Sequence, residues 1–342
     1  MDEVLDGRVP EVFALGEAMH GVAAFPLLRN EVLAHLVERG FRSIALEIDY
    51  FAAGVVDEYV NGVGYLENVL AEGFSHGFGR VPGNRELVEW LRAYNARAEE
   101  RVRFYGFDAP IEYAGAASPR RTLVAVVEGL GGDASDINAL VGVDEEWTNP
   151  AAMYDPAASI GASARAEELR GHPDDLARRV RTPELAAHAR TARGLLRYHA
   201  AMASGEPDRI GRLVAVRAEM MADNLRAIAA RERGRGPCLV HAHNRHLHPR
   251  SGAGALVAGE VPYLFVATDG GPGAPGTLQG ELAAATEGRG LFPGDALRAA
   301  LPKDVPVGEP VVRGHLPLTR DDLDGTDAVV FVAEPGEQHR YW

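Results

Sequence analysis

The sequence predicts an α/β protein with a mostly parallel central sheet that is flanked by helices, and with a helical insertion that lines a cleft. Three observations lead to this fold class. Short apolar runs of strand length recur along the chain, helical patterns separate them, and the middle of the chain is rich in Ala, Arg, Leu and Glu with little strand signal. Alternating strands and helices are typical of a parallel sheet covered by helices, so the helix-rich middle indicates an insertion.

Each predicted strand is a largely apolar run, as expected of strands that are buried on both faces of a sheet. In chain order the runs are Val12–Leu15, Ile44–Ile48, Val102–Phe107, Cys238–His241, Tyr263–Ala267 and Asp327–Ala333. The segment 250–280 around the fifth run is otherwise rich in Gly and Pro, which predicts loops there.

Helices are predicted where apolar residues recur near helical spacing. Phe25 to Arg39 and Arg85 to Glu100 show this pattern between the first three strands, and Gly40 fits the position just after a helix. Thr182 to Ala203 and Asp208 to Arg233 read as two long helices of the insertion. These elements divide the chain into an N-terminal α/β part (1–114), a helical insertion (115–235) and a C-terminal α/β part (236–342) that completes the sheet and the site.

The composition favours a globular protein that acts on a small molecule. The chain has 342 residues, 46% of them hydrophobic and 25% charged, and is long enough for a sizeable core. Its 35 Lys and Arg against 49 Asp and Glu give a net charge of −14, whereas binding to a phosphate backbone needs concentrated positive charge. The single cysteine, Cys238, can form neither an intrachain disulfide nor a cysteine-rich zinc site and reads as a small core residue.

The start of the chain lacks the pattern of a signal peptide, and no apolar run is long enough to span a membrane. We therefore expect a cytoplasmic protein with a small-molecule substrate, without a nucleic-acid or membrane partner, and either monomeric or a weak homo-oligomer.

Acids and histidines follow the predicted strands on their carboxyl side. Glu17 and His20 follow the first run, Glu47 lies near the end of the second, Asp108 follows the third, and the fourth leads into His241–His246. Because ligands of open parallel sheets bind at the carboxyl ends of the strands, we expect one cluster at this edge. Its expected members are Glu17, His20, Glu47, Asp108, His243 and His246.

Carboxylates beside imidazoles suit general acid–base catalysis. A neutral histidine can take a proton from water, a carboxylate can hold its tautomer, and a second, protonated histidine can stabilise an oxyanion. Taken singly, a histidine or glutamate at a strand end is more often a cap or a loop residue, and we regard His241 and His248 as bystanders. A divalent metal stays an open alternative, because the same side chains have the chemistry of zinc ligands.

Two shorter motifs lack the context that they need. Gly73–Gly77 fits the G-x-S-x-G pattern of a nucleophile elbow, but an elbow follows a strand, and Leu66–Glu72 reads as a helix. Gly271–Gly276 fits G-x-G-x-x-G by letter, but it lies in a proline-rich loop and does not open a helix. We interpret the second motif as a turn cluster.

In several of these segments the sequence resembles the erythromycin esterase family. The similar segments occur in the order of the family and extend over most of residues 11–270. They are Leu15–Gly21, Arg29, Gly40–Glu47, Trp90–Asn95, Phe104–Asp108, Arg217–Asn224 and His241–His246.

The resemblance implies a hydrolase that opens the ester of a macrolide or polyketide-like molecule with an activated water. It implies neither a covalent serine intermediate nor a metal or other cofactor. His20 would be the general base, and Glu17 and Glu47 would orient or polarise it.

The resemblance also implies roles for the residues around this base. Arg29, His243 and His246 would shape the site and stabilise charge. We expect the substrate to contact Met19, Asp108 and Asn244.

Two other functions stay open. The same base could drive a cyclisation or elimination on a biosynthetic intermediate, with no water consumed. The chain could also bind a small molecule without turnover, but binding alone does not call for so many convergent titratable groups.

Overall fold

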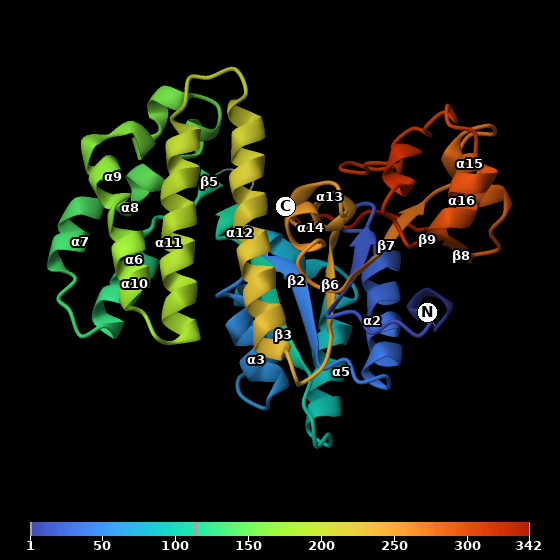
Figure 1. The fold of residues 1–342 in the computed structure, drawn as a ribbon, viewed down its shortest axis with the longest axis horizontal. Helices are drawn as coiled ribbons and strands as arrows, with labels where there is room; N and C mark the ends of the chain where they lie inside the picture. Colours follow the sequence, from blue (N-terminus) through green and yellow to red (C-terminus); the bar gives the residue numbers. More distant parts are fainter. Residues whose placement is uncertain (1, 113–114, 342) are drawn as a thin grey trace. The chain divides into compact units, whose positions relative to one another are not determined.

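The structure, a computed structural model, describes residues 2–112 and 115–341, and its centre is a sheet of seven strands in the described residues (Figure 1). Their spatial order is β3-β2-β6-β1-β7-β9-β8. The strands are β1 (Val12–Glu17), β2 (Ser43–Asp49), β3 (Arg103–Asp108), β6 (Cys238–His243), β7 (Tyr263–Gly270), β8 (Arg289–Pro293) and β9 (Ala328–Val332). The pairs β1–β6, β1–β7, β2–β6 and β7–β9 are parallel, and β8 runs antiparallel to β9. The predicted α/β fold with a mostly parallel sheet flanked by helices is confirmed.

The strand β1 lies at the middle of the sheet, and its register decides what stands at the carboxyl edge. Leu15 is paired with His241, and Glu17 is paired with His243. All residues of β1 and β6 are buried. The last residues of two neighbouring parallel strands, Glu17 and His243, therefore lie side by side.

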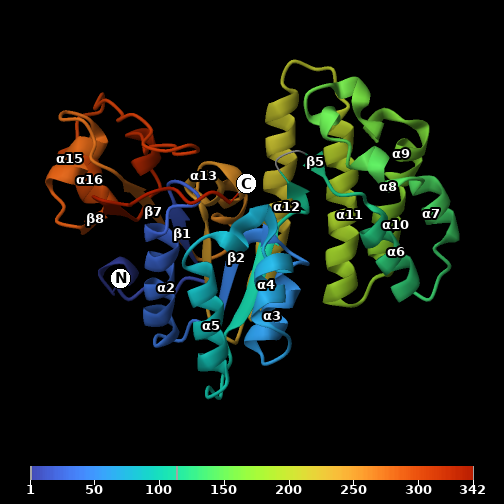
Figure 2. The ribbon, with the colours of Figure 1, turned by 180° about the vertical axis from the view of Figure 1, so that it is seen from behind.

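Helices pack against the sheet in the part of the chain that carries β1 and β2 (Figure 2). They are α1 (Asp2–Leu5), α2 (Ala24–Val37), α3 (Ala53–Val60), α4 (Leu66–Glu72), the 3₁₀ helix η1 (Ser75–Arg80) and α5 (Asn84–Asn95). Apolar residues of α2, α3 and α5 form one core cluster with those of β1 and β2. The predicted helices at 25–39 and 85–100 correspond to α2 and α5 but extend too far at their carboxyl ends.

The carboxyl end of α2 shows why this helix is shorter than predicted. The Phe41 N–H donates back to the Leu36 carbonyl, and Gly40 has a φ of +89°. Such a left-handed glycine closes a helix because it has no Cβ to clash with the backbone.

Helices also follow the later strands. They are α13 (Asn244–Leu247), α14 (Gly252–Val257), α15 (Leu278–Ala284), α16 (Gly294–Ala300) and the 3₁₀ helix η5 (Asp321–Leu323). The segment 250–280 holds the loops that its Gly and Pro predict, Gly271–Gly276 among them, but it also contains α14 and the start of α15. The strand β8 was not predicted, because Arg289–Pro293 is a partly exposed edge strand without a continuous apolar run.

The chain forms two compact units, one of residues 1–107 and 225–342 and the other of residues 108–224. The second unit is largely helical, and it contains the amino-terminal part of the long helix α12 (Arg209–Glu232). Its other elements are β4 (Ile111–Glu112), β5 (Gly115–Ala116), α6 (Arg120–Gly129), α7 (Ser135–Val141), α8 (Asp144–Trp147), η2 (Pro150–Met153), η3 (Pro156–Ala158), η4 (Ile160–Ala162), α9 (Ala164–Leu169), α10 (His172–Arg179) and α11 (Pro183–Met202). The division at 114 and 235 stays a prediction.

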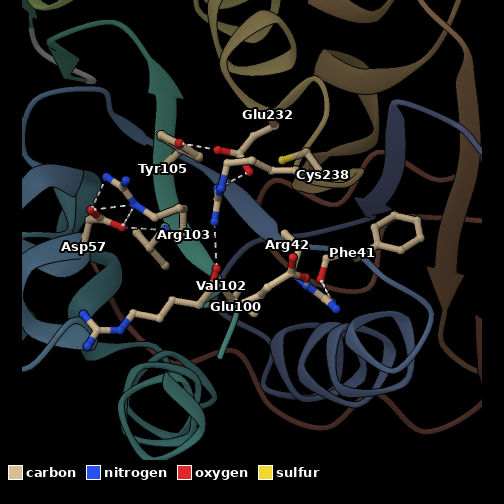
Figure 3. Close-up of polar contacts among 12 residues, drawn as sticks. Phe41, Arg42, Asp57, Glu100, Val102, Arg103, Tyr105, Glu232 and Cys238 are labelled. Atoms are coloured by element: carbon tan, nitrogen blue, oxygen red, sulfur yellow. Dashed lines mark hydrogen bonds and ion pairs between the residues drawn. The ribbon is translucent and has the colours of Figure 1, made fainter. Parts of the chain in front are cut away.

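Polar contacts fasten β3 to its neighbours in the first unit (Figure 3). Arg103 donates to both carboxylate oxygens of Asp57, and the Tyr105 hydroxyl donates to Glu232 at 2.6 Å. Burial raises the pKa of Cys238 to about 12, so its thiol stays protonated and acts as a small core group. In residues 2–112 and 115–341, no helix has both the length and the apolar character of a membrane span.

Candidate functional site

The structure brings five of the six expected side chains together at the carboxyl edge of β1, β2 and β6. Glu17 ends β1, and His20 follows in the turn before α2. Glu47 lies in β2, His243 ends β6, and His246 lies in the short helix α13. All five belong to the unit of residues 1–107 and 225–342. The roles of these residues stay a prediction.

His20 lies between the two carboxylates. Its Nδ1 is hydrogen-bonded to Glu17 Oε1, and its Nε2 lies 3.7 Å from Glu47 Oε2. A carboxylate accepts the proton of Nδ1, so the neutral ring carries its proton there and presents the Nε2 lone pair. The orientation is the one that a general base needs.

The charges around His20 determine its protonation. Burial alone would lower the pKa of His20, but the nearby carboxylates of Glu47 and Glu17 outweigh burial and raise it above the ordinary value of 6.5. Burial alone would likewise raise the pKa of Glu17, but the positive charge of His20 and its hydrogen bond hold that pKa well below the usual range. Glu17 is therefore a carboxylate at every pH at which the site works.

Glu47 is held by the segment that follows β6. The backbone N–H of His243 donates to Glu47 Oε2 at 2.9 Å, and His246 Nε2 lies 3.1 Å from Glu47 Oε1. These contacts fix the second carboxylate beside His20 and link β2 to α13.

The two ring nitrogens of His243 do different things. One caps a helix, as a histidine at a strand end commonly does, and the other offers a hydrogen-bond donor. Its Nδ1 accepts the backbone N–H of Arg245 at 3.2 Å and so caps α13. Burial, together with the positive charge of His20, lowers the pKa of His243 to about 4. At neutral pH the ring is therefore uncharged, with its proton on Nε2. This Nε2 is buried, and within the described residues no group accepts its hydrogen bond.

Arg29 is a buried cation near the carboxylates. It donates to Asn84 Oδ1 at 2.9 Å, to the Gly83 carbonyl at 3.1 Å and to Asn30 Oδ1. Burial lowers its pKa to about 10, so the guanidinium stays charged at neutral pH. Together with Glu17 and Glu47 it lines a small cavity in the site.

Two aromatic side chains that the sequence did not indicate stand beside His20. The ring centroid of Phe78 lies 5.0 Å from that of His20, and the ring of Tyr341 lies 6.2 Å from His20 and 5.3 Å from Phe78. The segment of Tyr341 is fastened by Gln338, whose side chain donates to the His20 carbonyl at 2.8 Å. Tyr341 is more than 300 positions from His20, so no local pattern could have revealed this pairing.

The three residues expected to contact the substrate are all buried. Met19 packs in an apolar cluster with Phe25 and Val332. The side-chain amide of Asn244 donates through Nδ2 to the Thr268 carbonyl and accepts the Thr268 N–H through Oδ1. A substrate contact by Met19 or Asn244 therefore stays a prediction.

Asp108 ends β3 and is counted with the second unit. Both of its carboxylate oxygens accept hydrogen bonds from Arg217, and its Oδ1 also accepts the Ala109 N–H at 2.8 Å. The sequence signal at Asp108 therefore corresponds to an ion pair within that unit, between a buried carboxylate and a partly exposed guanidinium.

The geometry bears on two alternative chemistries, metal binding and serine catalysis. In the described parts of the chain, 2–112 and 115–341, no three His, Cys, Asp or Glu side chains are grouped so that they could hold a metal ion. Helix α4 directly precedes Gly73, and the Ser75 hydroxyl accepts the Asp49 N–H at 2.8 Å. Ser75 therefore lacks the strand–turn–helix context of a nucleophile elbow.

The fold and the site define an α/β protein with a carboxylate–imidazole centre at the carboxyl edge of a mostly parallel sheet. The family model of erythromycin esterase matches residues 36–282, and the chain belongs to the erythromycin esterase family. The matched range contains Glu47 and the histidines of β6 and α13, and it begins after His20.

Known proteins resemble the chain in sequence and in fold. Erythromycin esterase type II of Escherichia coli is 31% identical over 100 residues, which are 29% of this chain and 23% of that protein. A histidine-to-asparagine mutant of the erythromycin esterase EreC, in its open conformation, has a TM-score of 0.69 at 18% identity, with 100% of this chain and 94% of that chain covered.

Two further solved structures are similar. A Bacillus cereus protein from a structural genomics programme has a TM-score of 0.68 at 16% identity and covers 99% of this chain and 92% of its own. A succinoglycan biosynthesis protein has a TM-score of 0.67 at 15% identity and covers 97% of this chain and 89% of its own. At these identities the structures establish the shared fold.

Proposed function

We propose that the protein is an ester or lactone hydrolase that acts on a macrolide or polyketide-like small molecule, with His20 as the general base. One observation carries this proposal: the hydrogen bond from His20 Nδ1 to Glu17 leaves Nε2 to accept a proton. Membership of the erythromycin esterase family supports hydrolysis as the reaction class.

In the proposed reaction, His20 Nε2 removes a proton from a water molecule as the water attacks the substrate carbonyl carbon. Glu17 and Glu47 compensate the charge of the imidazolium that forms. The carbonyl oxygen becomes an oxyanion in the tetrahedral intermediate. Collapse of this intermediate breaks the C–O bond, and the proton on His20 passes to the leaving alkoxide.

Two groups would stabilise the oxyanion. The uncharged His243 offers an Nε2–H that has no acceptor among the described residues, and its ring centroid lies 5.4 Å from that of His20. A pre-oriented, poorly solvated donor of this kind costs no reorganisation when the charge develops. Arg29 adds a fixed positive charge from its buried position. The sequence suggested a protonated histidine as the oxyanion donor. The proposal made here differs, because His243 donates its hydrogen bond as a neutral ring.

Phe78 and Tyr341 would form the apolar wall of the substrate site. The ring centroids of Phe78 and Tyr341 lie 5.0 Å and 6.2 Å from that of His20, and the His20 side chain itself is 20% exposed. An apolar wall suits the hydrocarbon part of a polyketide-like ester.

The test is mass spectrometry of the protein incubated with a panel of macrolactones and simple esters in H₂¹⁸O. We expect labelled acid from the native protein and a rate at least about 10²–10⁴-fold lower for His20→Ala, the range assigned to general-base catalysis. Ser75→Ala is the matched control and should keep native activity.

Other outcomes would contradict the proposal in distinct ways. A His20→Ala protein within a few-fold of the native rate removes His20 as the base. A product that depends on His20 but carries no label points to cyclisation or elimination. Loss of activity in Ser75→Ala, with native folding, would reinstate a serine nucleophile.

A further inference from the structure

His241 is a buried histidine next to Glu17, the carboxylate that is hydrogen-bonded to His20. A hydrogen bond to the backbone fixes its tautomer. His241 lies in β6, two positions before His243, so that both side chains are on the same face of the strand. Its Nδ1 lies 2.9 Å from the Leu15 carbonyl oxygen. A carbonyl oxygen only accepts, so Nδ1 carries the proton and Nε2 carries a lone pair when the ring is neutral. Burial lowers the pKa of His241, which favours this neutral ring.

The Nε2 lone pair of His241 faces the far oxygen of Glu17. The two atoms lie 3.4 Å apart, beyond the usual length of an N–H···O hydrogen bond. Both atoms are fully buried, and among the described residues neither has a hydrogen-bond partner. Two acceptors that face each other repel, so the arrangement calls for a donor that serves both.

A cavity beside these two atoms has the size and the lining to hold such a donor. Its volume is about 20 Å³, and the polar side chains in its wall are those of Glu17, Arg29, Glu47, Asn84 and His241. A water molecule needs roughly 10–15 Å³ and two to four polar partners. The cavity therefore has room for about one water molecule.

We propose that this cavity binds one water molecule, which donates one hydrogen bond to Glu17 Oε2 and one to His241 Nε2, and that His241 is thereby a positioning residue for Glu17. Arg29 lines the same cavity and can donate to the water oxygen. The resulting series runs from the Leu15 carbonyl through His241 and the water to Glu17, and from Glu17 to His20. It holds both oxygens of Glu17, so the carboxylate cannot rotate away from the base.

The charges of Glu17 and Arg29 act on the pKa of His241. The carboxylate of Glu47, from the neighbouring strand β2, lines the same cavity. The hydrogen bond that the water donates to Glu17 partly offsets the negative charge of this carboxylate. Its removal would leave the full carboxylate charge on His20 and raise the pKa of that base further. This consequence rests on the proposed function, whereas the water site itself does not.

The first test is a crystal structure at a resolution that shows ordered water, together with ¹⁵N NMR of the histidine rings at neutral pH. We expect a water within hydrogen-bond distance of Glu17 Oε2 and His241 Nε2. The NMR should show His241 with a protonated Nδ1 and an unprotonated Nε2. A direct Nε2–Oε2 hydrogen bond, or a doubly protonated His241 ring, would overturn the proposal. These results decide the water site whether or not any ester is turned over.

The second test compares two variants. In His241→Asn the amide can still donate to the Leu15 carbonyl, but it no longer reaches the water. In His241→Gln the longer amide reaches the position of Nε2 and loses the bond to Leu15. We expect His241→Asn to lower kcat about tenfold, the effect of one hydrogen bond, with KM unchanged and the rising limb of the kcat/KM profile moved to higher pH.

We expect His241→Gln to keep kcat within a few-fold and the native pH midpoint, although it loses a structural bond. Thermal unfolding of both variants identifies any loss of folding. If the Asn variant is unstable, the kcat and pH midpoint of the Gln variant still test the proposal. Equal kcat and pH midpoints in the Asn and native proteins, or an equal loss in both variants, would assign His241 a structural role only.

Discussion

At the scale of single residues, the site depends on one imidazole being held between two carboxylates. The same contacts that orient His20 also raise its pKa. A histidine that works as a base must be unprotonated. In the proposed function, the protein therefore combines good orientation of His20 with a base that is fully active only on the alkaline side of the ordinary histidine range.

This conflict predicts the pH dependence of the reaction. We expect kcat/KM, which reports the free enzyme, to rise with pH with a midpoint above 6.5, because the pKa of His20 is raised above that value. His243 should add no limb near neutrality, since its pKa is about 4. The measurement is kcat/KM for a simple ester between about pH 5 and 9. This range covers a midpoint above 6.5 from His20 and would also show a second limb near neutrality from His243. A midpoint below 6.5 would contradict the carboxylate effect on His20.

The same shift links the protonation of His20 to stability. A raised pKa in the folded state means that protonated His20 stabilises the fold below the unfolded value of 6.5. This contribution is lost as the pH rises through the higher folded value. Activation of the base and loss of this stabilisation therefore occur in the same pH interval.

At the scale of elements, the turn between β6 and α13 is built against the end of β1. Asn244 Nδ2 donates to the Thr268 carbonyl at 2.8 Å, and the Thr268 N–H donates to Asn244 Oδ1 at 3.2 Å. A Cβ on Gly16 would lie 2.0 Å from Asn244 Oδ1 and 3.2 Å from its Cα. Glycine at position 16 therefore lets the turn that carries His243 and His246 approach β1.

The change Gly16→Ala should destabilise the protein by about 1–3 kcal/mol, the usual cost of overpacking, and lower its activity, because Asn244 must move and the turn moves with it. The matched control is Gly54→Ala in α3, where no atom lies within 4 Å of the added Cβ. That change should stabilise the helix slightly, since Ala is the better helix former. Denaturant unfolding and ester turnover check both variants, and native stability in Gly16→Ala would contradict the close approach.

The sequence predicted the elements that bury continuous apolar runs and the side chains that follow them. Glu17, Glu47 and His243 could be placed in advance, because strands of a parallel sheet share one carboxyl edge. The strand β8 and the aromatic neighbour Tyr341 could not, since an edge strand needs no apolar run and a contact across 321 positions leaves no local pattern. Nothing in the sequence singles out His241, because its tautomer and its distance from Glu17 depend on the folded structure.

At the scale of the whole molecule, the negative net charge of the protein affects how a charged substrate approaches before it is bound. The net charge is −14, and the summed field of a protein attracts ligands of opposite charge and raises their association rate. This effect is independent of the local contacts in the site. It favours cationic esters over neutral esters of the same shape, provided that encounter with the protein contributes to kcat/KM.

Matched esters test this field. A choline ester and its neutral carbon isostere have nearly the same shape and differ in charge. As ionic strength rises from about 0.01 M to 0.15 M, the screening length falls from about 30 Å to about 8 Å. We expect kcat/KM to fall several-fold for the cationic ester and to stay constant for the neutral one. A parallel fall for both esters would mean that salt acts on the protein itself, and no change for either would mean that the field of the carboxylates does not reach the approaching substrate.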